Sequence, residues 1–195
     1  MSNRRSSDHY SRRARHAGFP ARSVYKLEEI DRRFRLFHPG QRVVDLGCVP
    51  GSWMMYAATA VGPQGRVVGC DLQPLRVSLP KNCSFSRVDV RELDAADPAL
   101  LRAADVVLSD MAPMTIGHRD TDHLRSAALV RTAHSLSDRL LRVGGALVAK
   151  LLDGRDFAAL REELATSFGK VHVVRPRSTR RESSELFFVA LSRRG

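Results

Sequence analysis

The spacing of hydrophobic residues predicts a series of helices along the chain. In residues 23–36 the apolar side chains recur at intervals of three, three and four residues, the pattern of one helical face: Val24, Leu27, Ile30 and Phe34. Pro39 and Gly40 then end this helix. Further helices are expected at 52–61, 97–103, 122–142 and 156–168.

Short apolar runs between these helices are typical of buried strands. Gly144 and Gly145 are expected to end the long helix and to open the fifth strand. Strands that alternate with helices form a parallel sheet covered on both faces. Because only the basic stretch 175–185 separates the last two strands, we expect a mostly parallel seven-stranded α/β sheet with an antiparallel terminal strand. The strands are expected at 42–46, 66–71, 84–89, 104–109, 145–150, 170–174 and 186–192.

The excess of basic residues indicates the kind of partner that the protein binds. The 195 residues fit one domain and carry 32 Lys and Arg against 21 Asp and Glu, a formal net charge of +11. Such an excess indicates a polyanionic partner, most simply nucleic acid. An arginine-rich surface from a GC-rich genome is the alternative, but the arginines crowd into the N-terminus and residues 175–181. We expect residues 1–22 to be a basic flexible arm and residues 23–195 to be a single domain.

The cysteines and the apolar runs bear on the compartment. Cys48, Cys70 and Cys83 show neither a CxxC pair nor a metal-ligand spacing, and sparse cysteines fit a reduced cytosol. No apolar run is long enough to span a membrane, and the basic N-terminus has no hydrophobic segment of the secretory type. We expect a cytoplasmic protein without a membrane partner that acts as a monomer.

The stretch 43–53 reads as the end of a strand, a glycine loop and the start of a helix. Its apolar run ends at Asp45, and Gly47 and Gly51 follow. Glycine is needed where the chain turns with positive φ or where a ligand approaches the backbone closely. Nicotinamide enzymes use GxGxxG to place a helix N-terminus on a pyrophosphate. The loop here lacks the middle glycine, which favours S-adenosylmethionine over a dinucleotide.

An acidic residue ends each of the first four predicted strands: Asp45, Asp71, Asp89 and Asp110. Open α/β sheets bind ligands at the carboxyl ends of their strands. The two oxygens of Asp71 can accept both hydroxyls of a nucleoside ribose, and Asp89 can accept from an adenine amino group. Helix capping is the alternative for any one acid, but four acids together with this loop favour a cofactor site.

Two lysines and two acids are candidates for catalysis. Lys150 closes the fifth apolar strand, and a lysine there must reach a cleft or a partner. Asp110 ends the adjacent strand, whereas Lys26 lies in the first helix and Glu185 opens the last strand. Taken alone, Lys26 reads as a surface lysine, and Glu182 competes with Glu185 by position. A lysine tuned by burial and neighbouring charges can take a proton from a hydroxyl that attacks a methyl sulfonium.

These residues resemble the FtsJ/RrmJ-type ribose 2′-O-methyltransferases over about residues 22–190. Members of that family carry a lysine in a Tyr/Phe-Lys-Leu helix, a DLGxxPGxW loop, an SDMAP segment, a lysine that ends strand five and a Ser-x-Glu before the last strand. The matching residues here are 25–27, 45–53, 109–113, 150 and 183–185. So many motifs in one order make the resemblance specific.

The resemblance implies a Rossmann-like class I methyltransferase fold that uses S-adenosylmethionine. It implies that Lys150 is the general base, supported by Lys26, Asp110 and Glu185. Bacterial members of this length methylate a uridine of 23S ribosomal RNA in the large ribosomal subunit, and relatives that act on tRNA anticodon loops or mRNA caps provide alternative substrates. The implied cofactor contacts are Asp45, Gly47, Gly51, Trp53, Asp71, Asp89 and Asp110.

Three residues depart from the family pattern. Val49 stands where a small residue is usual, and Ser52 stands where a second glycine is common. The Ser52 hydroxyl can cap the helix that follows. Met114 follows SDMAP in place of the usual Asn, near the expected substrate entrance. Met114 therefore bears on the details of the substrate rather than on the chemistry.

Other readings fit fewer residues. A nicotinamide-dependent oxidoreductase would need GxGxxG and a Tyr-x-x-x-Lys, and a non-catalytic ribosome-assembly factor that binds RNA would not need the two lysines and two acids. A polar loop in which Thr121 or Asp122 caps the long helix is a better interpretation of that region than a metal site, and no metal is expected. The metal reading rests on His118, Asp120, Asp122 and His123.

Overall fold

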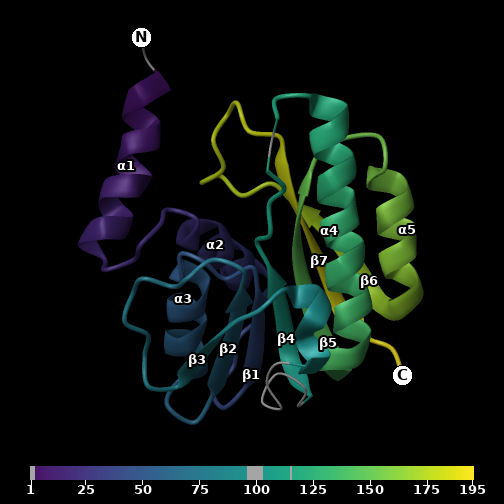
Figure 1. Cartoon of the computed structure of the whole chain (residues 1–195), viewed down its shortest axis with the longest axis horizontal. Helices are drawn as coiled ribbons and strands as arrows, with labels where there is room; N and C mark the ends of the chain where they lie inside the picture. Colours follow the sequence, from purple (N-terminus) through teal and green to yellow (C-terminus); the bar gives the residue numbers. More distant parts are fainter. Residues whose placement is uncertain (1–2, 96–102, 115) are drawn as a thin grey trace.

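A seven-stranded sheet in the order β3-β2-β1-β4-β5-β7-β6 forms the centre of the molecule (Figure 1). The computed structural model describes residues 3–95, 103–114 and 116–195. All seven predicted strands are confirmed, and β5 begins four residues earlier than predicted. The strands are β1 (Arg42–Leu46), β2 (Arg66–Asp71), β3 (Cys83–Arg87), β4 (Ala104–Ser109), β5 (Leu141–Leu152), β6 (Phe168–Val174) and β7 (Glu185–Arg193).

The directions of the strands also follow the prediction. β1 pairs in parallel with β2 and β4, β2 pairs in parallel with β3, and β4 pairs in parallel with β5. β7 is antiparallel to both of its neighbours, β5 and β6, and lies inside the sheet rather than at its edge. The chain leaves β1 for β2 on one side and later returns to β4 on the other. The carboxyl end of β1 is therefore the switch point at which open α/β sheets bind ligands.

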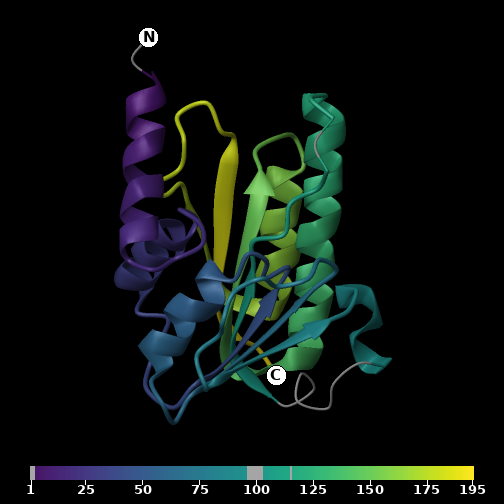
Figure 2. The same cartoon turned by 60° about the vertical axis from the view of Figure 1, so that its left-hand side comes forward.

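Helices cover both faces of the sheet (Figure 1, Figure 2). α2 and α3 pack on one face, and α4 and α5 pack on the other. Alternate residues of β4 join the two cores: Val106 and Leu108 face α2 and α3, and Val107 faces α4 and α5. The helices are α1 (Asn3–His16), α2 (Val24–Phe34), α3 (Ser52–Val61), the 3₁₀ helix η1 (Val90–Ala95), α4 (Arg119–Leu140) and α5 (Phe157–Ser167).

α1 lies within the segment that the sequence predicts to be a flexible arm, and it is helical over Asn3–His16. Tyr10 and Ala14 pack against Val24 and Tyr25 of α2, and Ala14 is only 1% exposed. The ring centroids of Tyr10 and Tyr25 lie 5.5 Å apart. These contacts come from tertiary packing, which the polar composition of the segment does not reveal.

Two boundary predictions are wrong. The long helix α4 begins at Arg119, three residues before the predicted start, and β5 follows it directly after Leu140. Gly144 therefore lies inside β5, with φ of 81°, and Leu141 is the C-cap residue. The predicted helix at 97–103 lies outside the described residues except for residue 103. In the ranges that are described, no helix has the length and apolar character that crossing a membrane requires.

Candidate active site

Lys150 and Asp110 meet at the carboxyl ends of neighbouring strands. Ser109 of β4 pairs with Ala149 of β5, so Asp110 and Lys150 follow at the same level of two parallel chains. The Lys150 Nζ atom lies 2.8 Å from Asp110 Oδ1 and donates a hydrogen bond of 2.6 Å to the Asp110 main-chain oxygen. Because Lys150 is only 6% exposed, its amine depends on these partners rather than on water.

A second ion pair joins α2 to β7. The Lys26 Nζ atom lies 2.5 Å from Glu185 Oε2. The antiparallel register places Phe187 opposite Lys150, and Glu185 lies two residues before Phe187 on the same face of the sheet. Because α2 covers that face, the two ion pairs lie close together. We call Lys26, Asp110, Lys150 and Glu185 the lysine–acid cluster.

The electrostatics of Glu185 support this arrangement. Burial raises its pKa, but the charge and hydrogen bond of Lys26 and the charge of Lys150 oppose burial and hold the pKa of Glu185 below its ordinary value. The carboxyl group is therefore ionised at neutral pH and balances positive charge at the cluster. Glu182 is exposed on the preceding loop, so the structure places Glu185 and not Glu182 in the cluster.

The loop after β1 brings bare backbone to the switch point. Gly47 has φ of 72°, and a Cβ atom there would lie 2.5 Å from Met111 Cγ. Gly51 has φ of 102° and immediately precedes α3. The Gly47 N–H donates to the Cys70 main-chain oxygen at 2.8 Å, which ties the loop to β2. Both glycines predicted for the cofactor therefore occupy positions that strain any other residue.

Asp45 is a fully buried carboxylate beneath this loop. It is 0% exposed and, among the described residues, neither of its carboxylate oxygens has a hydrogen-bond partner. Burial, followed by the negative charges of Asp110 and Asp71, raises the pKa of Asp45 well above its ordinary value. A small cavity of about 10 Å³ is lined by Asp45, Asp110, Trp53 and loop residues. A buried acid in this state suits a ligand that carries positive charge.

Asp71 and Asp89, the other acids predicted for the cofactor, have partners in the protein. The Asp71 carboxylate accepts hydrogen bonds from the N–H groups of Val49 at 3.0 Å and Gln73 at 2.8 Å. Asp89 lies two residues beyond the end of β3 and forms an ion pair with Arg91 at 2.5 Å. The hydrogen bonds from Arg91 lower the pKa of Asp89. A nucleoside that binds at Asp71 and Asp89 would therefore have to replace the hydrogen bonds that these carboxylates accept from the protein.

Trp53 and Ser52 begin α3 and hold it to the segment before α2. Trp53 is 2% exposed, its Nε1 donates to the Ser23 main-chain oxygen at 2.9 Å, and its ring centroid lies 5.8 Å from that of Phe187. The Ser52 hydroxyl accepts a hydrogen bond of 2.8 Å from the Ala21 N–H. The predicted capping role of Ser52 is therefore wrong, because Gly51 is the N-cap and no side chain caps this helix.

The structure adds Glu29, which the sequence analysis did not identify. Its carboxylate accepts hydrogen bonds from the N–H groups of Arg177 at 2.6 Å and Ser178 at 2.9 Å. Arg22 also donates to the Ser178 main-chain oxygen at 2.7 Å. These contacts fix the basic stretch 175–181 to α2. No local pattern could reveal this role, since Arg177 lies 148 positions after Glu29 in the chain.

The polar loop before α4 has a structural role. Asp122 accepts hydrogen bonds from two main-chain N–H groups of that loop. His123 contacts the Leu152 main-chain oxygen through Nδ1 at 2.7 Å and the Asp156 carboxylate through Nε2 at 3.0 Å. The N-cap of α4 is His118, so the predicted cap three or four residues later is wrong. Among the residues that are described, no group of three or more His, Cys, Asp or Glu could hold a metal ion.

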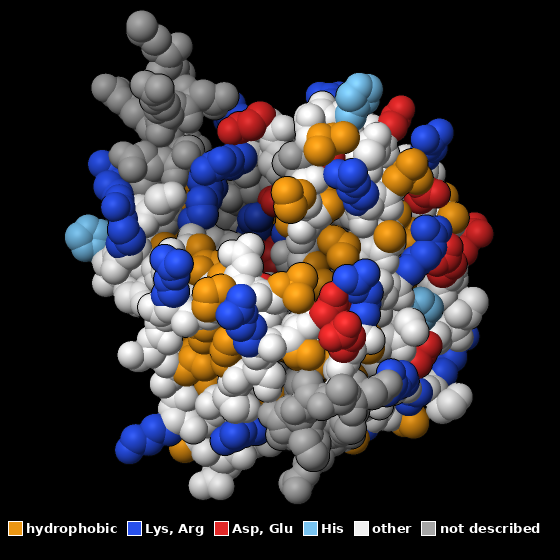
Figure 3. Space-filling view, viewed as in Figure 1, with side chains coloured by type: hydrophobic (Ala, Val, Ile, Leu, Met, Phe, Trp, Pro, Cys, Tyr) orange, Lys and Arg blue, Asp and Glu red, His pale blue; other side chains and the backbone are white. Residues whose placement is uncertain are grey.

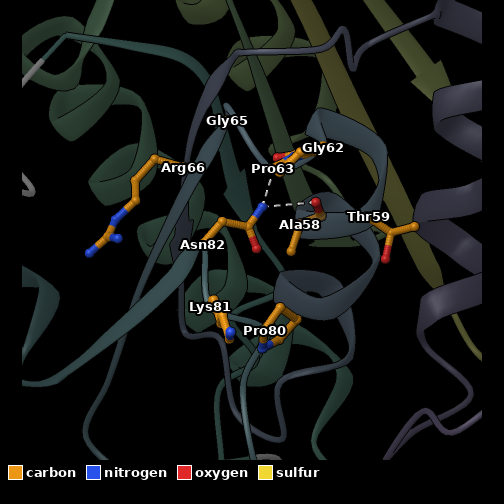
Figure 4. Close-up of a pocket in the computed structure, with 9 residues that line it drawn as sticks. All are labelled: Ala58, Thr59, Gly62, Pro63, Gly65, Arg66, Pro80, Lys81 and Asn82. Carbon is orange, nitrogen blue, oxygen red and sulfur yellow. Dashed lines mark hydrogen bonds between the residues drawn. The ribbon is translucent and has the colours of Figure 1, made fainter.

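The surface over the carboxyl ends of the strands is hollowed. Figure 3 shows Lys and Arg side chains around this hollow and acidic side chains within it. A larger cavity, of about 600 Å³, lies at the opposite end of the strands, where β2 begins at Arg66 (Figure 4). There Asn82 Nδ2 donates to the main-chain oxygens of Ala58 and Gly62. That cavity is therefore separate from the lysine–acid cluster.

The strand order, with β7 inserted antiparallel between β5 and β6, and the glycine loop at the switch point define a Rossmann-like fold, and the family match makes the protein a methyltransferase of that class. A crystal structure of a protein described as a ribosomal RNA methyltransferase of Plasmodium falciparum supports this fold. It superimposes with a TM-score of 0.79 at 23% sequence identity and covers 91% of this chain and 100% of that one.

The chain belongs to the FtsJ-like methyltransferase family, whose family model matches residues 19–193. A relative from Bdellovibrio bacteriovorus, named ribosomal RNA large subunit methyltransferase E, is 47% identical over 191 residues, which cover 96% of this chain and 97% of the relative. A relative of the same name from Desulfatibacillum aliphaticivorans is 44% identical, with 96% and 91% covered. The predicted family, fold class and methyltransferase activity are confirmed.

Proposed function

We propose that this methyltransferase uses S-adenosylmethionine to methylate a ribose 2′-hydroxyl of ribosomal RNA in the large ribosomal subunit, most simply a uridine of 23S RNA. The observation that carries the proposal is the 2.8 Å contact between the buried Lys150 amine and the Asp110 carboxylate, beside the glycine loop. The names of the relatives and the net charge of +11 support an RNA substrate.

The residues of the switch point fit S-adenosylmethionine. The cofactor carries an ammonium and a sulfonium group, and the buried carboxylate of Asp45 lacks a partner among the described residues. Gly47 and Gly51 would let the cofactor approach the backbone, since neither has a Cβ. The bound cofactor supplies an electrophilic methyl group. Asp71 would accept the ribose hydroxyls and Asp89 the adenine amino group, with Trp53 and Asp110 completing the contacts.

Lys150 is the proposed general base. In its neutral form, the amine would accept the proton of the ribose 2′-hydroxyl, which makes that oxygen a better nucleophile. Asp110 holds the amine in place through the contacts at 2.8 Å and 2.6 Å. Lys26 and Glu185 would support the base by keeping the charge of the cluster fixed and by orienting the ribose. The proton then passes from Lys150 to solvent.

The basic stretch 175–181 would grip the RNA backbone beside the reacting ribose. Arg175, Arg177, Arg180 and Arg181 belong to this stretch, and Glu29 fixes it to α2, the helix that carries Lys26. Arginines that contact phosphates position RNA without reading its sequence. The target nucleotide must therefore be selected by other contacts.

We further propose that the protein acts in the cytoplasm as a monomer, with residues 1–22 as a basic arm and residues 23–195 as one domain. Light scattering would then give a molar mass near 21.7 kDa in the absence of RNA. A mass of about twice that value would contradict the monomer.

The test is methyl transfer from labelled S-adenosylmethionine to three separate preparations from a strain that lacks the protein: bulk tRNA, free ribosomal RNA and isolated large subunits. Labelled RNA is then hydrolysed with alkali, because a 2′-O-methyl group protects the adjacent linkage. We expect label in large-subunit RNA at an alkali-resistant linkage. The same label in tRNA would support the proposed reaction but would identify tRNA as the substrate. Label in none of the RNAs, despite cofactor binding, would contradict the proposal.

A further inference from the structure

Two exposed hydrophobic side chains follow Asp110 of the lysine–acid cluster in the chain. Met114 is 89% exposed and Ile116 is 60% exposed, whereas most large apolar side chains among the described residues are buried. Both lie in the loop between β4 and α4, which begins at Asp110 of the lysine–acid cluster. Exposing an apolar side chain to water costs free energy, and a partner that covers the side chain removes this cost.

The protein holds this loop in place. Asp122 is 7% exposed, and its carboxylate accepts hydrogen bonds from the N–H groups of Ile116 at 2.9 Å and Gly117 at 3.1 Å. Arg125 Nη1 donates to the Met114 main-chain oxygen at 3.1 Å. The first two turns of α4 thus hold the main chain at Met114, Ile116 and Gly117. Met114 and Ile116 are therefore exposed on main-chain positions that α4 holds in place.

Met114 also lies within reach of the substrate. Met114 lies four positions after Asp110, and an extended chain of that length spans at most about 14 Å. The reacting ribose must lie against the Lys150 amine, 2.8 Å from Asp110. In Figure 3, hydrophobic side chains stand among the basic ones around the hollow over the strand ends.

We propose that Met114, flanked by Ile116, is a platform for one unpaired nucleobase of the substrate RNA, at or next to the methylated nucleotide. An enzyme that acts on one nucleotide in a cleft takes that nucleotide out of its stack, and the freed base needs a new apolar contact. Methionine suits this partner because its sulfur packs well against aromatic rings. The net charge of +11 favours RNA over an apolar protein segment as the partner. The inference rests on the proposed RNA substrate.

The test compares Met114→Ala and Met114→Phe with the wild-type protein. Val143→Ala is the matched control, because Val143 is also 60% exposed but lies near the start of β5, at the opposite end from Lys150. For each variant, initial rates of methyl transfer to large-subunit RNA give KM and kcat, and calorimetry gives the affinity for S-adenosylmethionine.

We expect Met114→Ala to raise the KM for RNA by about three- to tenfold, from the strength of a sulfur–ring contact, with kcat and cofactor affinity unchanged. Met114→Phe should stay within about twofold of the wild type, because an aromatic ring stacks on a base at least as well. An equal KM for Met114→Ala and Val143→Ala would overturn the inference, as would failure of phenylalanine to replace methionine. If the wild type methylates no RNA, the proposed function fails, and filter binding of large-subunit RNA decides the inference by the same comparison.

Discussion

Replacing Asp45 by asparagine is expected to stabilise the cofactor-free protein and to weaken cofactor binding. Asp45 is fully buried, and its carboxylate has no hydrogen-bond partner among the described residues. A buried polar group in that state costs about 1–3 kcal/mol, and more if it is charged. Asparagine has nearly the same shape without the charge. Because asparagine does not ionise, the substitution removes the cost of burying an acid at neutral pH and should raise the free energy of unfolding by about 1–2 kcal/mol, or the melting temperature by about 2–8 °C.

The size of this gain should depend on pH in a defined direction. Burial, and then the charges of Asp110 and Asp71, raise the pKa of Asp45 in the folded protein. The contribution of such an acid to stability is fully present below the unfolded pKa of about 3.9 and is lost as pH rises towards the folded pKa. The advantage of Asp45→Asn should therefore grow as the pH rises above about 4.

Thermal unfolding between pH 4 and pH 8, with and without S-adenosylmethionine, measures both effects. Asp120→Asn is the control, because Asp120 is exposed at the start of α4 and its replacement should change stability by less than about 0.5 kcal/mol. With cofactor present, the wild type should gain more stability than Asp45→Asn. A variant that melts at or below the wild-type temperature at pH 7, or a difference that is independent of pH, would show that burial of Asp45 does not destabilise the protein.

Three further predictions concern the loop, the cluster and the basic stretch. Gly47→Ala should abolish detectable cofactor binding in calorimetry, whereas Gly62→Ala, which has a similar φ of 69° but open space around it, should retain it. Glu185→Gln should lower the free energy of unfolding in urea by about 1–3 kcal/mol at pH 7, because Lys26 loses its charged partner. Since the folded pKa of Glu185 is lowered, this difference should shrink as pH falls below about 4.3 through the folded pKa; a constant difference would contradict the assignment. Glu29→Ala should release the basic stretch 175–181, seen as faster tryptic cleavage there and a higher KM for RNA at unchanged cofactor affinity; an unchanged cleavage rate would count against that anchor.

Much of this fold could be predicted from local patterns. The apolar intervals of Val24, Leu27 and Ile30 follow the buried face of α2, and each apolar run corresponds to a strand. The helix α1 and the boundary at Gly144 could not be predicted from local patterns, because both depend on packing between distant elements. Gly144 resembles a helix stop in sequence, yet the pairing of Leu141 with Ala104 already begins β5 before it.

Some residues of the candidate site could likewise be predicted from the sequence, whereas others could not. Residues placed by strand register, such as Asp110 and Lys150, could be predicted because a parallel sheet brings the ends of adjacent strands together. The partner of Lys26 could not be decided between Glu182 and Glu185 until the register of β7 was known. Glu29 was missed, since its hydrogen bonds form across the fold and leave no periodic signal in the chain.

The proposed mechanism depends on the Lys150 amine, which would take the proton from the attacking hydroxyl. The most direct measurement is the single-turnover rate of methyl transfer to large-subunit RNA by Lys150→Ala and Lys150→Met, with RNA and cofactor affinities measured on the same samples. We expect both variants to transfer methyl groups about 10²- to 10⁴-fold more slowly, with both affinities retained. Methyl transfer within a few fold of the wild-type rate, by a variant that folds and binds RNA, would contradict it.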